Sequence, residues 1–177
     1  MNKIKIAHVL HSVGGVDIYL RLISENTNPK EISHIIIHQF DVSKKAYLNN
    51  DKKIKEYYIP IKREINIIGD LMSIYKTIKY LRIERPNVIH AHSAKGGVIA
   101  RIASLFYRVN VLYTPHAFSY LSANSKLKRL LFLKTEQFFK HFNSTILSTS
   151  QSEKKRAIND VHFKKSKAII FNNSVLP

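Results

Sequence analysis

Residues 88–118, VIHAHSAKGGVIARIASLFYRVNVLYTPHAF, decide the fold because they alternate between the sequence patterns of strands and of a helix. Val88–His92 form a short, mainly apolar run, bounded by Pro86 and by the Ser-Ala-Lys-Gly-Gly stretch of Ser93–Gly97. Proline prevents a helix from continuing, and a short bounded run of this kind is typical of a buried strand. The sequence therefore predicts a strand that ends at His92 and is followed by a turn.

After the glycines the apolar residues recur at three- and four-residue spacing, which predicts a helix. They are Val98, Ile99, Ile102, Leu105 and Phe106, with Arg101, Ser104 and Arg108 between them. Val111–Thr114 is a second apolar run, and Pro115 stops it. The whole stretch is therefore predicted to form a strand, a helix and a second strand, with His116 just beyond the second strand.

A strand-helix-strand unit makes a parallel pair with a right-handed crossover, and open sheets of such units bind ligands outside the carboxyl ends of the strands. Four polar residues follow or end the two predicted strands: His92, Ser93, Lys95 and His116. We expect them to meet at this edge of the sheet.

Composition limits the class of protein. The chain has 177 residues, 45% of them hydrophobic, which suits one soluble domain with a sizeable core. It has no cysteine, which excludes disulfides, thiolate zinc sites and cysteine nucleophiles. Neither a membrane span of roughly 18 apolar residues nor a good signal peptide is visible, so a cytoplasmic location is the default expectation.

The formal net charge of +17 is the unusual feature, and it implies an anionic partner such as nucleic acid, a membrane surface or a phosphorylated substrate. Residues 121–167 hold eleven Lys or Arg against three acidic residues. No known nucleic-acid motif is present, and few aromatic residues lie among these basic ones, so no nucleic acid is expected.

The remaining elements follow from the same patterns. Strands are predicted over 3–10, 32–40, 55–60, 145–148 and 168–171, helices over 16–25, 65–85 and 127–142, and a short basic helix after the Ser150-x-x-Glu153 capping box. Residues 41–53 are predicted to be a polar connection with an exposed turn at 49–51. This alternation predicts a doubly wound α/β domain over residues 1–171, with a mostly parallel sheet of about six or seven strands.

Two glycine-bearing segments are candidate anion sites because each is predicted to join a strand to a helix, whose positive end attracts anions. One is Gly14-Gly15. The other contains Gly96, with Lys95 adding charge and Ser93 as a possible cap. The structural alternatives are a tight turn that needs positive φ at the first segment and close helix packing at the second.

Histidines are the remaining candidates. His90 and His92 face the same side of a strand and could share a metal, but no cysteine or nearby carboxylate supports this, so a hydrogen-bonded buried His90 and an edge-facing His92 are favoured. Pro115 is expected to project His116 into the ligand cleft, although a lone histidine is often a structural residue.

Residues 126–142 are both basic and very apolar, as in a helix that lies on an anionic membrane. Its membrane-facing residues are expected to be Lys126, Lys128, Arg129 and Lys134. The alternative is a core helix with a solvated basic rim.

Five segments together resemble the N-terminal domain of GT-B glycosyltransferases of the large retaining family 4, of the kind that assembles bacterial capsular polysaccharide or exopolysaccharide. They are VGGVDIYL (13–20), VIHAHSAKGGVIARIA (88–103), VLYTPHAF (111–118), STSQSEK (148–154) and IIFNNS (169–174). The resemblance covers essentially the whole chain.

The resemblance implies a Rossmann-like, acceptor-side lobe that faces a donor-binding lobe across a cleft. It implies that Gly14 and Gly15 lie beside the acceptor and the donor phosphate, that Ser93 and Lys95 border the cleft, and that His116 contacts the transferred sugar. His92 and Gly96, at the same predicted edge, are also expected to bind the substrate. Transfer would retain configuration, use a nucleotide sugar without cofactor or metal, and rely on the leaving phosphate to help deprotonate the acceptor. The acceptor would be a glycan or a lipid-linked molecule at the inner membrane surface.

Two departures from the family pattern stand out. His116-Ala117 replaces the usual His-Gly, and Asn172-Asn173 replaces the usual Asn-Gly at the start of the hinge, here residues 172–177. The paired-glutamate donor motif of the C-terminal lobe is absent, so this chain alone is predicted to be inactive. The alternative hypothesis is a non-catalytic basic α/β module that binds nucleic acid or an anionic membrane.

Overall fold

The computed structural model describes residues 3–172. The expected hinge falls mostly on residues 173–177, outside the described part. The strands are β1 (Ile4–Val9), β2 (Ile32–His38), β3 (Leu48–Asn49), β4 (Lys52–Lys53), β5 (Lys55–Tyr58), β6 (Val88–His92), β7 (Asn110–Thr114), β8 (Ser144–Ser148) and β9 (Ala168–Ile170). The α-helices are α1 (Gly14–Asn26), α2 (Ile67–Glu84), α3 (Ser93–Phe106), α4 (Lys126–Phe139) and α5 (Gln151–Asn159), and the short 3₁₀ helices are η1 (Ser119–Ser122) and η2 (Lys165–Lys167).

Seven strands form one parallel sheet in the order β5-β2-β1-β6-β7-β8-β9, which confirms the predicted α/β class and strand count. The strand order reverses at β1, which pairs with β2 on one side and with β6 on the other. Such a reversal leaves a crevice outside the carboxyl ends of the strands. The fold therefore makes the ends of β1 and β6 the expected ligand site.

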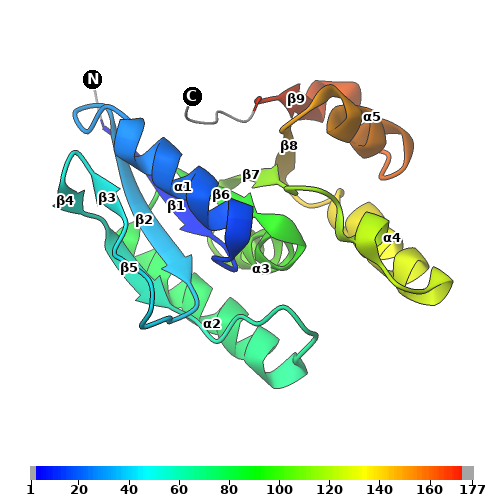
Figure 1. The fold of residues 1–177 in the computed structure, drawn as a ribbon, viewed down its shortest axis with the longest axis horizontal. Coiled ribbons are helices and arrows are strands. Elements are labelled where there is room, and N and C mark those ends of the chain that lie inside the picture. Colours follow the sequence, from blue (N-terminus) through cyan, green and yellow to red (C-terminus); the bar gives the residue numbers. More distant parts are fainter. Residues whose placement is uncertain (1–2, 173–177) are drawn as a thin grey trace.

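The two faces of the sheet are covered differently, as Figure 1 shows: α1 lies on one face, whereas α2 and α3 lie on the other. Alternate strand residues such as Ala7, Val9, Ile89 and Ala91 face α2 and α3 in the larger apolar core. The α1 face has a small apolar cluster that includes Leu10 and four other buried residues. Four buried histidines, His8, His34, His90 and His92, also lie within the protein on strands β1, β2 and β6.

The boundary between β6 and α3 differs from the prediction, because the helix begins at Ser93 and includes both glycines. A Cβ atom on Gly96 would lie 2.5 Å from the carbonyl oxygen of Val9, and one on Gly97 would lie 2.5 Å from Cε2 of Tyr113. Real Cβ atoms do not approach so closely, so these glycines allow α3 to pack directly on β1 and β7. Close helix packing at this segment is therefore confirmed, and its role in substrate binding stays a prediction.

Two of the polar residues within the α3 pattern are buried rather than exposed. Arg101 has no exposed surface and Ser104 has 5%. One guanidinium nitrogen of Arg101 lies 3.1 Å from a carboxylate oxygen of Glu136, whose other oxygen accepts a 2.6 Å bond from the Tyr113 hydroxyl. This buried ion pair joins α3 to α4 and explains how a charged residue is accommodated in the core.

The helix predicted over 65–85 is confirmed as α2, but most of its large apolar residues are exposed. Ile67, Ile68, Leu71 and Tyr75 are 63–80% exposed, and its buried residues are Ser73, Thr77 and Leu81. The polar connection over 41–53 contains a small hairpin of β3 and β4 that the pattern missed. None of the helices described here is long and apolar enough to cross a membrane.

Candidate active site

His116 lies in a strained turn at the carboxyl end of β7. Its φ is +51°, and that of Ala117 is +70°. Residues other than glycine rarely adopt this left-handed region, and such strain persists only where surrounding contacts hold it. The backbone N–H of Ala117 donates a 2.9 Å bond to Oε1 of Glu153, whose Oε2 accepts from the backbone N–H of Thr149 at 2.6 Å. The buried Glu153 therefore fixes the turn that presents His116.

The imidazole of His116 is partly exposed and contacts two other rings. Its Nε2 lies 3.2 Å from Nδ1 of His92, and the ring of Tyr19 meets it edge-on with centroids 4.7 Å apart. Burial lowers the pKa of His116 to about 4, so the ring is neutral at physiological pH. The structure thus confirms the expected place of His116 at the carboxyl edge, and gives it a ligand-accessible, uncharged side chain.

His92 differs from the prediction, because its ring is fully buried instead of facing the edge. It lies behind His116, where it supports that ring and cannot itself meet a ligand in this arrangement. The reason is the strand period of two: His92 shares the α1 face of the sheet with His90, and α1 covers that face. His90 is buried and lies 2.9 Å from Oγ1 of Thr114, as expected.

The row of imidazoles continues away from the site. Nε2 of His92 lies 3.0 Å from Nδ1 of His8, and Nε2 of His8 lies 2.9 Å from Nδ1 of His34. Nε2 of His34 lies 3.0 Å from Oγ1 of Thr27. We refer to His116, His92, His8 and His34, with Thr27 at the end, as the imidazole row.

Nitrogen atoms of His8, His90 and His92 lie within 4.8 Å of one another, so these rings form a candidate metal cluster. Both nitrogens of His8 and both of His92 are already paired with other imidazoles. An ion bound here would have to break these hydrogen bonds, and no carboxylate belongs to the cluster. That the protein needs no metal stays a prediction.

The first glycine segment lies where predicted, at the carboxyl edge. Gly14 and Gly15 are exposed in the first turn of α1, and no atom lies within 4 Å of where a Cβ would stand on either. Gly14 has a φ of +54°, which fits the tight-turn alternative. The open space above the helix end also leaves backbone N–H groups accessible to a ligand.

Ser93 and Lys95 also differ in detail from their predicted roles. Ser93 has a φ of +61° and does not cap α3; His92 takes the N-cap position without a side-chain bond. Nζ of Lys95 lies 2.6 Å from Oδ2 of Asp70 and 2.9 Å from the carbonyl oxygen of Glu64. Lys95 is thus held at the start of α3 by α2 and its preceding loop.

Basic side chains that the sequence patterns did not single out gather near the first glycine segment. The pKa of His11 is lowered by burial and by the charges of Lys44, Arg63 and Lys95, with Glu64 opposing them. Lys44 reaches the turn itself, where Nζ donates to Oγ of Ser12 at 3.0 Å. Basic side chains from separate segments therefore lie near the N-terminus of α1, where Asp17 partly offsets Lys44 at 3.6 Å and Asp70 partly offsets Lys95 at 2.6 Å.

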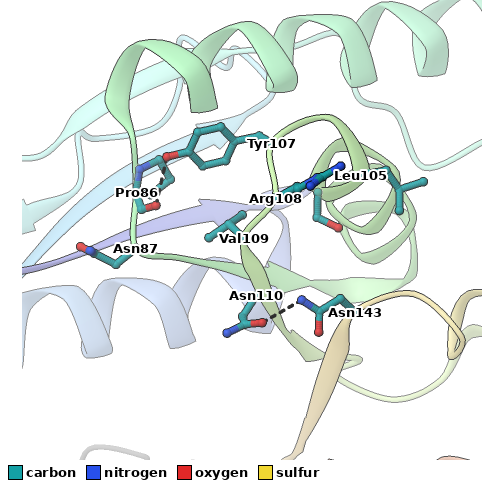
Figure 2. Close-up of a pocket in the computed structure, with 9 residues that line it drawn as sticks. Pro86, Asn87, Leu105, Tyr107, Arg108, Val109, Asn110 and Asn143 are labelled. Atoms are coloured by element: carbon teal, nitrogen blue, oxygen red, sulfur yellow. Dashed lines mark hydrogen bonds between the residues drawn. The ribbon is translucent and has the colours of Figure 1, made fainter.

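Two cavities lie at opposite edges of the sheet. One of about 240 Å³ is at the carboxyl edge, beside the His116 turn. Its lining residues are Ala117, Phe118, Leu121, Thr149, Ser150, Ser152, Glu153 and Arg156. The other, about 580 Å³, is at the amino edge, where Figure 2 shows Asn110 bonded to Asn143 and Tyr107 bonded to Pro86. Neither cavity is lined by a predicted site residue, but Ala117 and Glu153 of the smaller one belong to the turn that holds His116. We therefore place the site at the carboxyl edge.

Sequence reasoning missed Glu153, Tyr19 and His8 as contributors to the site. The Ser150-x-x-Glu153 motif was visible, but only as a helix start. Ser150 does cap α5 by accepting from the N–H of Glu153 at 3.1 Å. The glutamate side chain turns instead to the His116 loop, a contact across 36 residues that no local pattern signals.

The expected membrane-facing residues of α4 are all exposed, as are several apolar neighbours. Lys126, Lys128, Arg129 and Lys134 have high exposure, and Leu127, Leu130, Leu131 and Phe138 are 51–78% exposed. Figure 1 shows α4 extending away from the sheet. Residues 126–131 are exposed, whereas Phe132 and Leu133 pack against the larger core and Glu136 is the one fully buried residue of α4 among those described. That the exposed residues face a membrane stays a prediction.

Comparison with known proteins agrees with this geometry. The family model for Glycosyltransferase Family 4 matches residues 13–175. The chain belongs to glycosyltransferase family 4.

Curated relatives include a UDP-Gal:alpha-D-GlcNAc-diphosphoundecaprenol alpha-1,3-galactosyltransferase from Escherichia coli, 26% identical over 98% of this chain and 46% of its own length. An uncharacterised protein of the Klebsiella pneumoniae cps region is 30% identical over 99% of this chain and 47% of its own length. The chain thus spans about half the length of these relatives.

Solved structures with the same fold include a glycosyltransferase from Rickettsia africae, with a TM-score of 0.73 and 13% identity. The superposed region covers 99% of this chain and 44% of the Rickettsia africae chain. Anabaena Alr3699/HepE in complex with UDP and glucose has a TM-score of 0.72 and 17% identity, covering 97% of this chain and 45% of that one. At these identities the likeness shows the fold.

Proposed function

We propose that this family 4 chain is the acceptor-side lobe of a retaining glycosyltransferase that transfers a sugar from a nucleotide sugar to a glycan or lipid-linked acceptor in bacterial surface polysaccharide synthesis. The observation that carries the proposal is His116, held by Glu153 in a strained turn at the same carboxyl edge as the exposed Gly14-Gly15 segment. The similarity to a galactosyltransferase that acts on a diphosphoundecaprenol-linked sugar supports it.

In this proposal different residues position the sugar and bind the phosphate. The neutral ring of His116 positions the sugar by a hydrogen bond, since a pKa of about 4 leaves it unprotonated. Gly14 and Gly15 admit the phosphate-bearing part of a substrate, and His11, Lys44, Arg63 and Lys95 favour its negative charge. In this proposal the donor's leaving phosphate helps to deprotonate the acceptor, and no metal takes part.

The exposed face of α4 suggests where in the cell the enzyme would bind its acceptor. Four basic residues and four exposed apolar residues on one protruding helix are suited to an anionic lipid surface. The proposal therefore includes a peripheral position on the inner face of the cytoplasmic membrane, where a lipid-linked acceptor would be reached.

The test is alanine substitution of His116 in the enzyme that carries both lobes. Turnover of the nucleotide sugar with a diphosphoundecaprenol-linked acceptor is expected to fall at least about tenfold, because the interaction that positions the reacting sugar is lost. Thermal unfolding should remain cooperative, at a lowered unfolding temperature because Nδ1 of the buried His92 loses its partner. The 177-residue chain alone is expected to give no turnover.

The matched control is His141→Ala, which removes an exposed imidazole just after α4 and is expected to leave turnover near that of the wild type. Unchanged kinetics in His116→Ala would return that residue to a structural role. Transfer by the 177-residue chain alone would contradict the assignment of an acceptor-side lobe.

A further inference from the structure

The four rings of the imidazole row are neutral, so each carries one N–H and one bare nitrogen. Burial lowers the pKa of His34 and of His116 to about 4, and lowers the pKa of His8 and His92 well below the usual value, with neighbouring histidines adding to the effect on these two. A neutral imidazole that uses both nitrogens must donate at one and accept at the other. The direction of any one hydrogen bond in the row therefore determines the direction of all the others.

That direction is fixed at the far end, by Thr27. Its hydroxyl is bonded to the carbonyl oxygen of Ile23, one turn back in α1. A carbonyl oxygen can only accept, so the single hydroxyl proton of Thr27 points to Ile23. Toward His34 the oxygen of Thr27 can then only accept, and Nε2 of His34 must carry the proton that lies between them.

The consequence passes along the row to the site. With its proton on Nε2, His34 accepts at Nδ1 from Nε2–H of His8. His8 in turn accepts at Nδ1 from Nε2–H of His92. His92 accepts at Nδ1 from Nε2–H of His116. All four protons are thus on Nε2, and Nδ1 of His116, which has no hydrogen-bond partner among residues 3–172, keeps a lone pair.

We propose that the buried imidazole row, oriented by Thr27, fixes the tautomer of His116 so that Nδ1 presents only an acceptor to the ligand. Thr27, His34, His8 and His92 are then positioning residues that act through His116. A bare nitrogen repels phosphate and carbonyl oxygens and accepts from a hydroxyl. Resting on the proposed function, the group it recognises is a hydroxyl of the transferred sugar.

The first experiment measures the tautomers directly in the ¹⁵N-histidine-labelled chain at neutral pH, without substrate. Long-range ¹H–¹⁵N spectra distinguish a protonated from a bare ring nitrogen, and the spectrum of His116→Gln assigns the His116 signals. We expect His116, His92, His8 and His34 all to carry the proton on Nε2. A proton on Nδ1 of His116, or a doubly protonated ring, overturns the proposal.

The second experiment changes the far end of the row. Thr27→Val keeps the shape but removes the acceptor of the His34 N–H, so the row loses its preferred direction. With a hydrogen bond worth roughly 1 kcal/mol, the tautomer ratio at His116 should shift at least about fivefold toward the Nδ1–H form. Thr27→Ser restores the hydroxyl and is expected to restore the wild-type spectrum.

The matched control is Thr135→Val, since the Thr135 hydroxyl donates to the carbonyl of Leu131 four residues back but meets no histidine. It should leave the His116 signals unchanged. If Thr27→Val leaves them unchanged as well, the proposal is wrong. If Thr27→Val does not fold, the wild-type and Thr27→Ser spectra still test the proposal, because both must show the proton on Nε2 of His116. Because these readouts need no substrate, failure here is distinguishable from failure of the proposed transferase activity.

Discussion

At the scale of single residues, the histidines combine two properties that usually conflict. They are polar, yet His8, His34, His90 and His92 are at most 7% exposed. Each is hydrogen-bonded to another imidazole or to a threonine hydroxyl, which offsets part of the cost of burying a polar ring. The same burial keeps the rings neutral, and this makes folding sensitive to acid.

We expect the free energy of unfolding to fall as the pH is lowered. The pKa of His34 is about 4 in the folded chain against 6.5 without burial, so between these values the unfolded chain binds more protons. The stabilisation is complete above pH 6.5 and is lost as the pH falls toward 4, at up to about 1.4 kcal/mol per pH unit for each such histidine. Urea unfolding across this interval measures the slope.

His34→Gln removes one titrating ring from both states, and its unfolding free energy should depend less steeply on pH than that of the wild type. A pH-independent stability between 6.5 and 4 would contradict the burial of these rings. The prediction concerns the slope, so it holds even where the variant is less stable at every pH.

At the scale of elements, α3 is the best-anchored helix and α4 the least. The glycines let α3 approach β1 and β7 closely, and the buried pair of Arg101 and Glu136 connects α3 to α4. The ring of Tyr113 stacks under the Arg101 guanidinium at 4.3 Å. Near its C-terminus α4 is held by this ion pair, by the Tyr113 hydroxyl bond to Glu136 and by Phe132 and Leu133 against the core, while most of its first half faces solvent.

Glu136→Gln should lower the free energy of unfolding by about 3–5 kcal/mol, because it leaves the buried Arg101 without a counter-charge. Urea titration measures the change. The control is Glu25→Gln, an exposed glutamate on α1, with an expected change within about 0.5 kcal/mol. The double variant Arg101→Met/Glu136→Met should lose less free energy of unfolding than Glu136→Gln alone. A larger loss in the double variant would mean that the unpaired charge does not explain the effect of Glu136→Gln.

At the scale of the whole molecule, the basic residues behind the net charge of +17 are unevenly distributed. Part surrounds the carboxyl edge, near His11, and part follows the protruding α4. The first part suits a phosphorylated substrate, and the second suits an anionic surface. One molecule can therefore use its excess charge for two separate contacts.

Changing Lys126, Lys128, Arg129 and Lys134 together to Gln should weaken binding to phosphatidylglycerol-containing vesicles at least about a hundredfold, since each basic residue near such a surface contributes about 1 kcal/mol. Cosedimentation of the protein with these vesicles at increasing salt concentration measures the change in binding. The control changes four exposed lysines elsewhere, Lys52, Lys53, Lys164 and Lys165. Equal weakening in both variants would show that net charge, and not α4, is responsible.

The sequence alone determined the order and type of the main elements, the parallel sheet and the edge at which His116 lies. These depend on local periods and on proline and glycine, which act over a few residues. Only the tertiary structure decided that His8 and His34 join His92 behind His116, that Glu153 holds the turn and that Arg101 is buried. Such contacts join residues 26 to 84 positions apart, and strand register and helix docking set them, neither of which a local pattern records.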